Sequence, residues 1–444
     1  MPRSLDEWLA YQAQLHPQTI DLGLARVSCV LERLNWRQPT VPVITIAGTN
    51  GKGSVTAYCA AILGAAGYRV GTFTSPHLRD YRERIRIHDR LVTSDELLRA
   101  FERIETARFA AQDSVSLTFF EYNAMAAFLI FEAARLDVWV LEVGMGGRLD
   151  AVNVVDPSVA VVVSIALDHQ EYLGHTLEEI AREKAGIFRK DRGAVLGSRE
   201  LPRPVADIAR SVGATVKRLG SEFDFTPGRA GWHYRGSRWQ LPGLPAPALL
   251  GGAQVANAAT AIAALEELDT RLMVPAGAVA EGLKSVKLMG RFQVIALGHG
   301  RPTWILDVAH NPDAARVLGE NLRSMPALGK TLAVCGILAD KDAAAIAARL
   351  RECFDAWWLA STDGARGSSA ALLEERIAGQ VGVPLALADD IAAACAAAAA
   401  AAGPNDRIVV FGSFHTVGPA LDWLDSQRLL PPGTLPEYTD RLCG

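Results

Sequence analysis

The segment at residues 44–55, ITIAGTNGKGSV, contains residue types that bind phosphate, in a spacing that departs from the usual pattern. In the common phosphate-binding loop, Ser or Thr directly follows the Gly-Lys pair. Here Gly53 follows Lys52, and the first hydroxyl comes one residue later, at Ser54. The glycines would still let backbone amides approach phosphate closely, and Lys52 would add a positive charge. The segment therefore predicts a nucleotide-binding loop; the plainer alternative is a Gly-rich turn with an incidental lysine.

A carboxylate, Glu142, follows the apolar run VWVL at 138–141. An acid at the carboxyl end of a central strand, beside a phosphate loop, is a usual place for a Mg²⁺ ligand. The plainer alternative is an acid that simply ends a strand. The presence of the loop favours the metal site.

Two further segments, ALDHQ (166–170) and DVAHNPDA (307–314), place acids and histidines after apolar runs. The pair at 168–169 could contribute a metal ligand, but by itself it more simply caps a turn. Asn311 and Pro312 form an ordinary helix start. That start does not explain Asp307 and His310, which would lie at the carboxyl end of a strand, where ligands of α/β proteins bind.

A parallel sheet is needed to bring these side chains together. Apolar runs predict strands at 41–48, 68–75, 137–144 and 158–165. Amphipathic stretches predict helices at 54–66, 94–106, 118–135 and 176–188. The glycine-rich loop then lies between a strand and a helix, which is the context that a phosphate loop requires.

The rest of the chain predicts a second α/β unit. Residues 195–250 are Gly-, Pro- and Arg-rich and indicate small strands and loops, followed by helices at 252–268 and 276–286. From 303, strand-like runs alternate with helical stretches after 312, 340, 370 and 390. We expect an α/β protein: a P-loop-containing parallel-sheet ATPase domain (1–296), the linker ALGHGRPT (296–303), and a smaller Rossmann-like α/β domain (297–444), with ligands between them.

Composition narrows the class of protein. The 444 residues are half hydrophobic, with a formal net charge of -4 and no block of like charge that would indicate nucleic acid or an anionic membrane. The arginines at 79–90 alternate with acids, which indicates a solvated or ligand-facing loop. Six scattered cysteines without a C-x-x-C motif indicate free thiols. The N-terminus lacks a signal-like apolar run, and the alanine-rich stretch at 392–402 is too short for a membrane span. We expect a cytoplasmic protein with no nucleic-acid or membrane partner.

The motifs, in their order and spacing, resemble the folylpolyglutamate synthase/dihydrofolate synthase enzymes of the Mur ligase superfamily, nearly from end to end. The segments that carry the resemblance are TIDLGLARV (19–27), AGTNGKGS (47–54), TSPHL (74–78), TFFEY (118–122), LEVGMGGRLDAVN (141–153), ALDHQEYLG (166–174), EKAGIF (183–188), GRFQV (290–294), DVAHNPDA (307–314), DKD (340–342) and FGSFHTVG (411–418).

The resemblance implies an ATP-dependent ligase that forms an amide bond through an acyl phosphate. Its substrates would be dihydropteroate, tetrahydrofolates, L-glutamate and ATP, with two Mg²⁺ ions and room for a monovalent cation such as K⁺. GGRLDA (146–151) resembles the form found in bacterial bifunctional members, so we expect both dihydrofolate synthesis and extension of the glutamate tail. The resemblance also favours a monomer.

Individual roles carry over by matching position. The nucleotide would be held by Gly48, Thr49, Asn50, Gly51, Lys52, Gly53, Ser54, Asn257, Arg291 and Asp307. The metal ions would be held by Ser75, Glu142, His169 and Lys184. Lys184 matches a lysine that family members carbamylate, although position alone would make it a surface-helix lysine; with Lys52 and His310 it forms the expected catalytic set. The pterin side would involve Thr19, Ile20, Asp21, Leu22, Thr118, Phe119, Phe120, Glu121, Leu149, Asp150 and Ala151.

Two alternatives remain open from the residues. A peptidoglycan-precursor ligase of the same superfamily would use similar ATP chemistry on a UDP-muramoyl substrate, although such ligases usually place Ser or Thr directly after the loop lysine. A non-ligase P-loop NTPase, acting as a switch or motor, would need neither the second α/β domain nor the lysine of EKAGIF.

Overall fold

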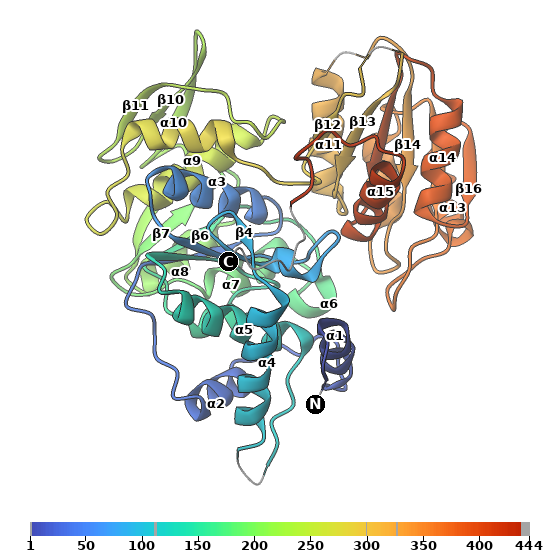
Figure 1. Ribbon diagram of the computed structural model, residues 1–444. Coiled ribbons are helices and arrows are strands. Elements are labelled where there is room, and N and C mark those ends of the chain that lie inside the picture. The colour runs from blue at the N-terminus through green and yellow to red at the C-terminus, as the bar shows by residue number, and fades with distance from the viewer. Residues whose placement is uncertain (1, 111–112, 299, 326, 437–444) are drawn as a thin grey trace.

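The computed structural model describes residues 2–110, 113–298, 300–325 and 327–436. Two lobes lie side by side, each built on its own sheet (Figure 1). The first lobe contains an eight-stranded sheet, and the second lobe contains a six-stranded sheet. The expected α/β architecture, with two successive parallel-sheet units, is confirmed.

The eight-stranded sheet of the first lobe has the strand order β4-β3-β2-β5-β1-β6-β7-β8. Its strands are β1 (Val43–Ala47), β2 (Val70–Phe73), β3 (Ile85–Ile87), β4 (Arg90–Leu91), β5 (Val138–Glu142), β6 (Val159–Val162), β7 (Gly193–Leu196) and β8 (Thr215–Arg218). The six strands from β2 to β8 in that order run parallel, and β3 and β4 add an antiparallel edge. Residues 43–47 are buried throughout, since alternate side chains enter two separate cores.

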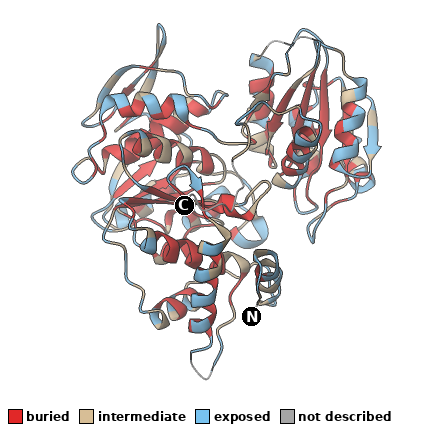
Figure 2. Cartoon of the chain, in the orientation of Figure 1, coloured by how far each residue is buried: buried red, intermediate tan, exposed pale blue. Residues whose placement is uncertain are grey.

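Helices cover both faces of this sheet, which leaves its strands in the interior (Figure 2). One core contains side chains from α1 (Leu5–Gln14), α2 (Ala25–Arg33), α4 (Ser94–Arg108), α5 (Phe119–Ala134), α7 (Leu177–Ala185) and α8 (Arg203–Ser211). The opposite core contains side chains from α3 (Lys52–Ala65), α9 (Gln254–Glu266) and α10 (Ala276–Ser285). Short helical turns η1 (Tyr81–Arg84), η2 (Ala151–Val154) and α6 (Gln170–Leu173) lie in the connections.

The six-stranded sheet of the second lobe has the order β12-β13-β17-β14-β15-β16 and is parallel except for β12. Its strands are β12 (Gln293–Ile295), β13 (Thr303–Asp307), β14 (Thr331–Cys335), β15 (Ala356–Ala360), β16 (Leu385–Ala388) and β17 (Arg407–Phe411). One face is covered by α11 (Pro312–Ser324), α12 (Ala343–Leu350) and α13 (Ala370–Ile377), and the other by α14 (Ile391–Ala401) and α15 (Phe414–Ser426).

The region at 195–250 differs in part from its prediction. A small antiparallel sheet of β9 (Asp224–Gly228), β10 (Gly231–Arg235) and β11 (Gln240–Leu244) confirms the expected strands. The helix α8, however, lies where only strands and loops were expected. It begins directly after Pro202 and buries Val205 and Ala209, so the surrounding Pro and Arg residues masked a short amphipathic helix.

The linker predicted at 296–303 is wrong, because β12 already pairs with β13 inside the second sheet. Those residues connect the two strands of a hairpin rather than the two lobes. The division at 296/297 falls inside this hairpin, and residues 299, 326 and 437–444 of the second predicted domain lie outside the described part of the chain.

Free thiols are found at Cys29, Cys59, Cys335, Cys353 and Cys395, as expected, whereas Cys443 lies outside the described residues. Within the described ranges, none of the helices is both long and apolar enough to cross a membrane.

Candidate active site

Four neighbouring parallel strands of the first sheet, β2, β5, β1 and β6, deliver the predicted residues to one edge. The glycine-rich loop follows β1, Ser75 follows β2, Glu142 ends β5, and His169 follows β6. The carboxyl ends of parallel strands meet at the same edge of a sheet, so residues far apart in sequence come together there. The same edge of the second sheet contributes Asp307, which ends β13, and Ser413, which follows β17.

The glycine-rich loop ends at Gly51, which begins helix α3 in a left-handed conformation (φ 86°). A Cβ at this position would lie 2.8 Å from a side-chain carbon of Val163, so only glycine fits. The loop is fastened to the end of β6: the amide of Thr49 donates to the carbonyl oxygen of Ser164 (2.8 Å), and the amide of Asn50 donates to the Ser164 hydroxyl (3.0 Å). The first amides of α3 lack partners within the helix and are suited to bind phosphate.

Two lysines meet in this loop. The Lys52 ammonium donates to the carbonyl oxygens of Gly48 (3.1 Å) and Thr49 (3.2 Å), and the Lys184 ammonium donates to the same Gly48 oxygen (3.0 Å). The Lys184 side chain, far from lying on the surface, is 5% exposed. Burial, followed by the charge of Lys52, lowers the pKa of Lys184 to about 7. The amine is therefore partly neutral at physiological pH.

Glu142 lies in the interior beside the loop and is 5% exposed. Burial raises the pKa of this carboxyl, against the opposing charges of Lys52 and Arg291. Within the described chain, its one hydrogen-bond donor is the backbone amide of Ser75, at a long 3.4 Å. A buried carboxylate with so few donors is suited to a cation.

His169 begins α6 in a left-handed conformation (φ 50°). Burial lowers the pKa of this imidazole to about 4, although the charge of Asp168 opposes the shift. A neutral imidazole is the form that binds metal ions. Across the described ranges, no three His, Cys, Asp or Glu side chains form a ready-made metal site, so the candidate donor set combines a hydroxyl, a carboxylate, an imidazole and Lys184.

Asp307 and Arg291 face the loop from the second lobe. Asp307 accepts hydrogen bonds from the amides of Phe292 and Ala309, both at 2.8 Å. The Arg291 guanidinium lies over the ring of Phe414, 5.0 Å from its centre. Burial lowers the pKa of Arg291 and raises that of Asp307, and the attraction between the two charges opposes both shifts.

The beginning of α11 contacts the loop directly. The side chains of Asn50 and Asn311 exchange hydrogen bonds of 3.0 and 3.2 Å, and Asn50 also donates to Asp313 (3.0 Å). Asn311 thus caps its own helix and binds the other lobe as well. His310 donates from Nδ1 to the Val308 carbonyl oxygen (2.8 Å), which leaves Nε2 facing the first lobe.

A cavity of about 610 Å³ is lined by all the residues expected to bind nucleotide or metal. It extends from the glycine-rich loop to the beginning of α9 and along α11. Its walls include Gly48, Thr49, Asn50, Gly51, Lys52, Gly53, Ser54, Ser75, Glu142, His169, Lys184, Asn257, Arg291, Asp307 and His310.

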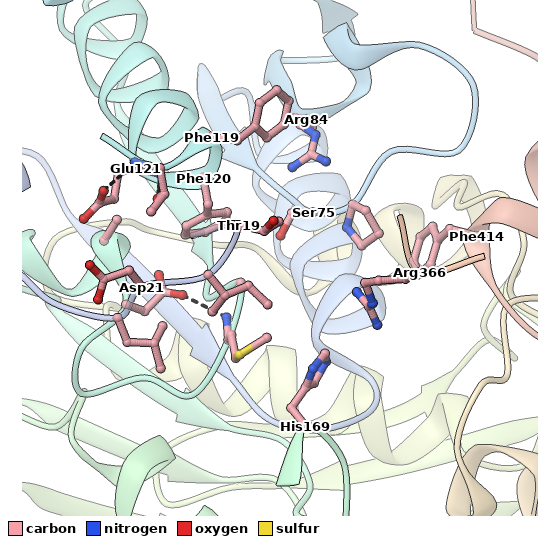
Figure 3. Close-up of a pocket in the computed structure, with 18 of the residues that line it drawn as sticks. Thr19, Asp21, Ser75, Arg84, Phe119, Phe120, Glu121, His169, Arg366 and Phe414 are labelled. Atoms are coloured by element: carbon pink, nitrogen blue, oxygen red, sulfur yellow. Dashed lines mark hydrogen bonds between the residues drawn. The ribbon is translucent and has the colours of Figure 1, made fainter. Parts of the chain in front are cut away.

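A second cavity of about 380 Å³ is lined by all the residues expected on the pterin side. Figure 3 shows Thr19, Asp21, Phe119, Phe120 and Glu121 of the first lobe around it, with Arg366 and Phe414 opposite. The remaining expected members that line it are Ile20, Leu22, Thr118, Leu149, Asp150 and Ala151. The two cavities adjoin, because Ser75, Gly144, His169, His310 and Phe414 line both.

Two acids of the second cavity have hydrogen-bond partners in the loops that form its wall. Asp150 accepts from the amides of Met145 (2.8 Å) and Val152 (3.0 Å), and burial raises its pKa to about 6. Glu121 accepts from the amide of Thr118 (2.8 Å) and from the Arg26 guanidinium (3.0 Å). These side chains therefore hold the loops in place as well as face the cavity.

The second cavity also contains residues that sequence reasoning did not assign. Arg84 is buried beside the rings of Tyr81 and Phe119, 5.9 and 5.5 Å from their centres, and donates to His77 Nδ1 (2.8 Å). It lies in the arginine-rich segment at 79–90, and at this position the side chain faces the cavity rather than solvent. Further lining residues are Leu338, Lys341, Arg366, Ser413 and His415. The motifs DKD and FGSFHTVG were the available signal for three of them, Lys341, Ser413 and His415.

Comparison with known proteins places these features in context. Residues 46–198 match the model of the Mur ligase middle domain, and residues 290–414 match the Mur ligase, glutamate ligase domain. The chain is 43% identical over 424 residues to the dihydrofolate synthase/folylpolyglutamate synthase of Escherichia coli, covering 96% of each protein.

Two solved structures are similar over nearly the whole chain. E. coli FolC in complex with DHPP and ADP has a TM-score of 0.90 and 42% identity, covering 96% of this chain and 100% of that one. A bifunctional folylpolyglutamate synthase/dihydrofolate synthase with Mn, AMPPNP and L-glutamate bound has a TM-score of 0.86 and 42% identity, covering 95% and 98%.

Proposed function

Because the chain belongs to the family of bifunctional dihydrofolate synthases/folylpolyglutamate synthases, we propose that it is an ATP-dependent glutamate ligase. It joins L-glutamate to dihydropteroate, and it also extends the glutamate tail of tetrahydrofolates. The observation that carries this proposal is the junction of the two cavities, whose shared wall includes Ser75, Gly144, His169 and His310. A pterin carboxylate at that junction would meet the terminal phosphate of a nucleotide in the larger cavity.

The reaction begins with attack by the substrate carboxylate on the terminal phosphorus of ATP, which releases ADP and leaves an acyl phosphate. Both reactants are anions, so positive charge and hydrogen-bond donors must offset their repulsion. The amides that begin α3, together with Lys52 and Arg291, supply these groups from opposite sides of the nucleotide cavity. Asn257, at the beginning of α9, is assigned to the adenine, and Asp307 to the nucleotide from the second lobe.

The second step is attack by the amino nitrogen of L-glutamate on the acyl carbon, with phosphate as the leaving group. The reacting carbon would lie where the first lobe's Ser75 faces the second lobe's His310 and Ser413. Because residues from both lobes line this place, the approach of the lobes excludes water, which would otherwise hydrolyse the acyl phosphate.

The side chains at the loop fit divalent cations such as Mg²⁺. The nearly donor-free carboxylate of Glu142, the hydroxyl of Ser75 and the neutral imidazole of His169 are suitable ligands. Lys184 completes the set if its amine takes up carbon dioxide, which converts a buried cation into an anion. When bound, the metal ions would neutralise phosphate charge. Two ions, a carbamylated Lys184 and a site for a cation such as K⁺ are parts of this proposal.

One assay tests the function. ADP release is measured with dihydropteroate plus L-glutamate, with tetrahydrofolate plus L-glutamate, and with a UDP-muramoyl substrate plus an amino acid. We expect release with both folate pairs. Stimulation by the muramoyl pair alone would assign a peptidoglycan-precursor ligase, and equal ATP hydrolysis without any acceptor would assign an NTPase switch. A monomeric, cytoplasmic enzyme without nucleic-acid or membrane partners is proposed from composition and family.

A further inference from the structure

Asp168 makes a buried charged contact between the two lobes. Its Oδ1 accepts from the Lys341 ammonium (2.6 Å), and its Oδ2 lies 3.4 Å from His310 Nε2. Asn311 Nδ2 lies 3.3 Å from the same oxygen. These three partners all belong to the second lobe, while Asp168 follows β6 of the first lobe.

Lys341 has few alternatives to this partner. Its side chain is 6% exposed and that of Asp168 is 8% exposed, so neither charge is well hydrated in this arrangement. Lys341 also lies 3.7 Å from Asp340, but Asp340 is itself bound by Arg366 through both carboxylate oxygens (3.0 and 2.6 Å). Lys341 lines the pterin cavity and is held at the base of α12.

Both carboxylate oxygens of Asp168 already have hydrogen-bond donors, which leaves little room for a metal ion. Besides the second-lobe groups, Oδ1 accepts from the amide of His169 (2.9 Å). His169, the neighbouring residue, is the one that faces the metal donor set. The carboxylate and the imidazole therefore have different tasks, although they are adjacent in sequence.

We propose that Asp168 is a positioning residue that couples closure of the two lobes to assembly of the active site. When the lobes approach, Asp168 and Lys341 both lose water. The free-energy cost of this desolvation is offset only if the two charges come into direct hydrogen-bonded contact. The pair thereby fixes where Lys341, His310 and the beginning of α11 come to rest against the glycine-rich loop. Misplacement of these groups would slow the reaction even with every ligand bound.

A contact between the same lobes in which the two carboxylates are exposed, although the arginine is only 17% exposed, provides a comparison. Arg79 of the first lobe lies 2.6 Å from Asp422 and 3.2 Å from Asp425 of α15, whose side chains are 58% and 48% exposed. Exposed ion pairs contribute little, because water and salt screen them. The double variant Asp422→Asn/Asp425→Asn therefore removes interlobe charge without disturbing the buried contact.

The first test measures closure itself. Small-angle X-ray scattering of the full chain with Mg²⁺ and a non-hydrolysable ATP analogue should give a larger radius of gyration for Asp168→Asn and for Lys341→Met than for wild type. The Asp422→Asn/Asp425→Asn control should match wild type. The variant Asp168→Asn/Lys341→Met should be no more open than the single variants; an additive effect would overturn the coupling.

The second test measures what closure does for catalysis, and this arm rests on the proposed function. Asp168→Asn should lower kcat by roughly 10- to 100-fold while the KM for ATP changes by less than about threefold. Mn²⁺ affinity is measured by electron paramagnetic resonance. If Asp168→Asn loses Mn²⁺ affinity while its radius of gyration equals that of the wild type, the proposal is overturned and Asp168 is a metal ligand. Absence of ligase activity in the wild type would refute the function alone, since the scattering result does not depend on it.

Discussion

The ammonium groups of Lys184 and Lys52 donate to one and the same carbonyl oxygen, that of Gly48, at 3.0 and 3.1 Å. Two cations that share an acceptor repel each other, and the one that is more deeply buried yields its proton more readily. Burial, and then the charge of Lys52, lowers the pKa of Lys184 to about 7. A neutral amine is the form that reacts with carbon dioxide, so this geometry supports the proposed carbamate at Lys184.

Replacement of Lys184 by alanine should lower the turnover rate by roughly 100-fold, because the proposed anionic metal ligand is lost. Short-chain carboxylates added to Lys184→Ala should partly restore activity by occupying the space of the carbamate. Lys190→Ala, which alters an exposed lysine nearby, is the control and should remain active. A fully active Lys184→Ala variant would exclude an essential carbamate.

The stability of the protein should depend on the protonation of Lys184. The pKa of this amine is about 7 in the folded state and about 10.4 in the unfolded state, so the unfolded chain binds more protons between these values. The free energy of unfolding should therefore rise with pH, by about 1–3 kcal/mol from pH 7 to pH 9 in buffer free of carbon dioxide. Lys184→Met should lack this contribution, as judged by denaturant unfolding of both proteins; equal slopes would refute it.

Ser75→Ala should impair Mg²⁺-dependent turnover more than Ser54→Ala. Ser75 follows β2 and its amide contacts Glu142, so its hydroxyl lies beside the candidate metal site. Ser54 lies within α3 and is 1% exposed. When activity is titrated with Mg²⁺, the Mg²⁺ concentration that gives half-maximal activity should be roughly 10-fold higher for Ser75→Ala than for the wild type. The reverse ranking would return the metal role to the glycine-rich loop.

Gly144→Ala should weaken pterin binding. A Cβ at this position would lie 2.5 Å from the ring of Phe120, which would have to move into the pterin cavity. Overpacking of this kind costs about 1–3 kcal/mol, so the KM for dihydropteroate should rise by roughly 10-fold. Gly64→Ala is the matched control, since a Cβ there would meet His88 at an ordinary 3.5 Å. Equal KM values for the two variants would contradict the prediction.

Local sequence patterns predicted most of the elements. The apolar run before Gly48 and the alanine-rich stretch after Lys52 correspond to β1 and α3, because a strand covered on both faces and a helix each impose a recognisable spacing. The region at 195–250 was harder, because α8 is short and lies among Pro and Arg residues. The connection between the lobes was misplaced, because a Gly-rich hairpin and a linker have similar composition.

The candidate site was predictable as a set of motifs, but several of its contacts were not. The order of strands places Ser75, Glu142, the loop and His169 at one edge, and the family resemblance had grouped them in advance. Arg84 and Arg366 were not assigned, since an arginine that faces a cavity has the same local sequence as one that faces water.

By itself, the sequence determined the strand–loop–helix unit around AGTNGKGS and the two-lobed α/β architecture, because hydrophobic spacing and glycine positions are local properties of the chain. Only the tertiary structure decided that Lys184 is buried against Gly48, and that Lys341 meets Asp168 across 173 residues. Charge pairing depends on which faces of two sheets approach each other and on how much water they exclude. Neither the facing surfaces nor the amount of excluded water can be predicted from the spacing of residues along one segment.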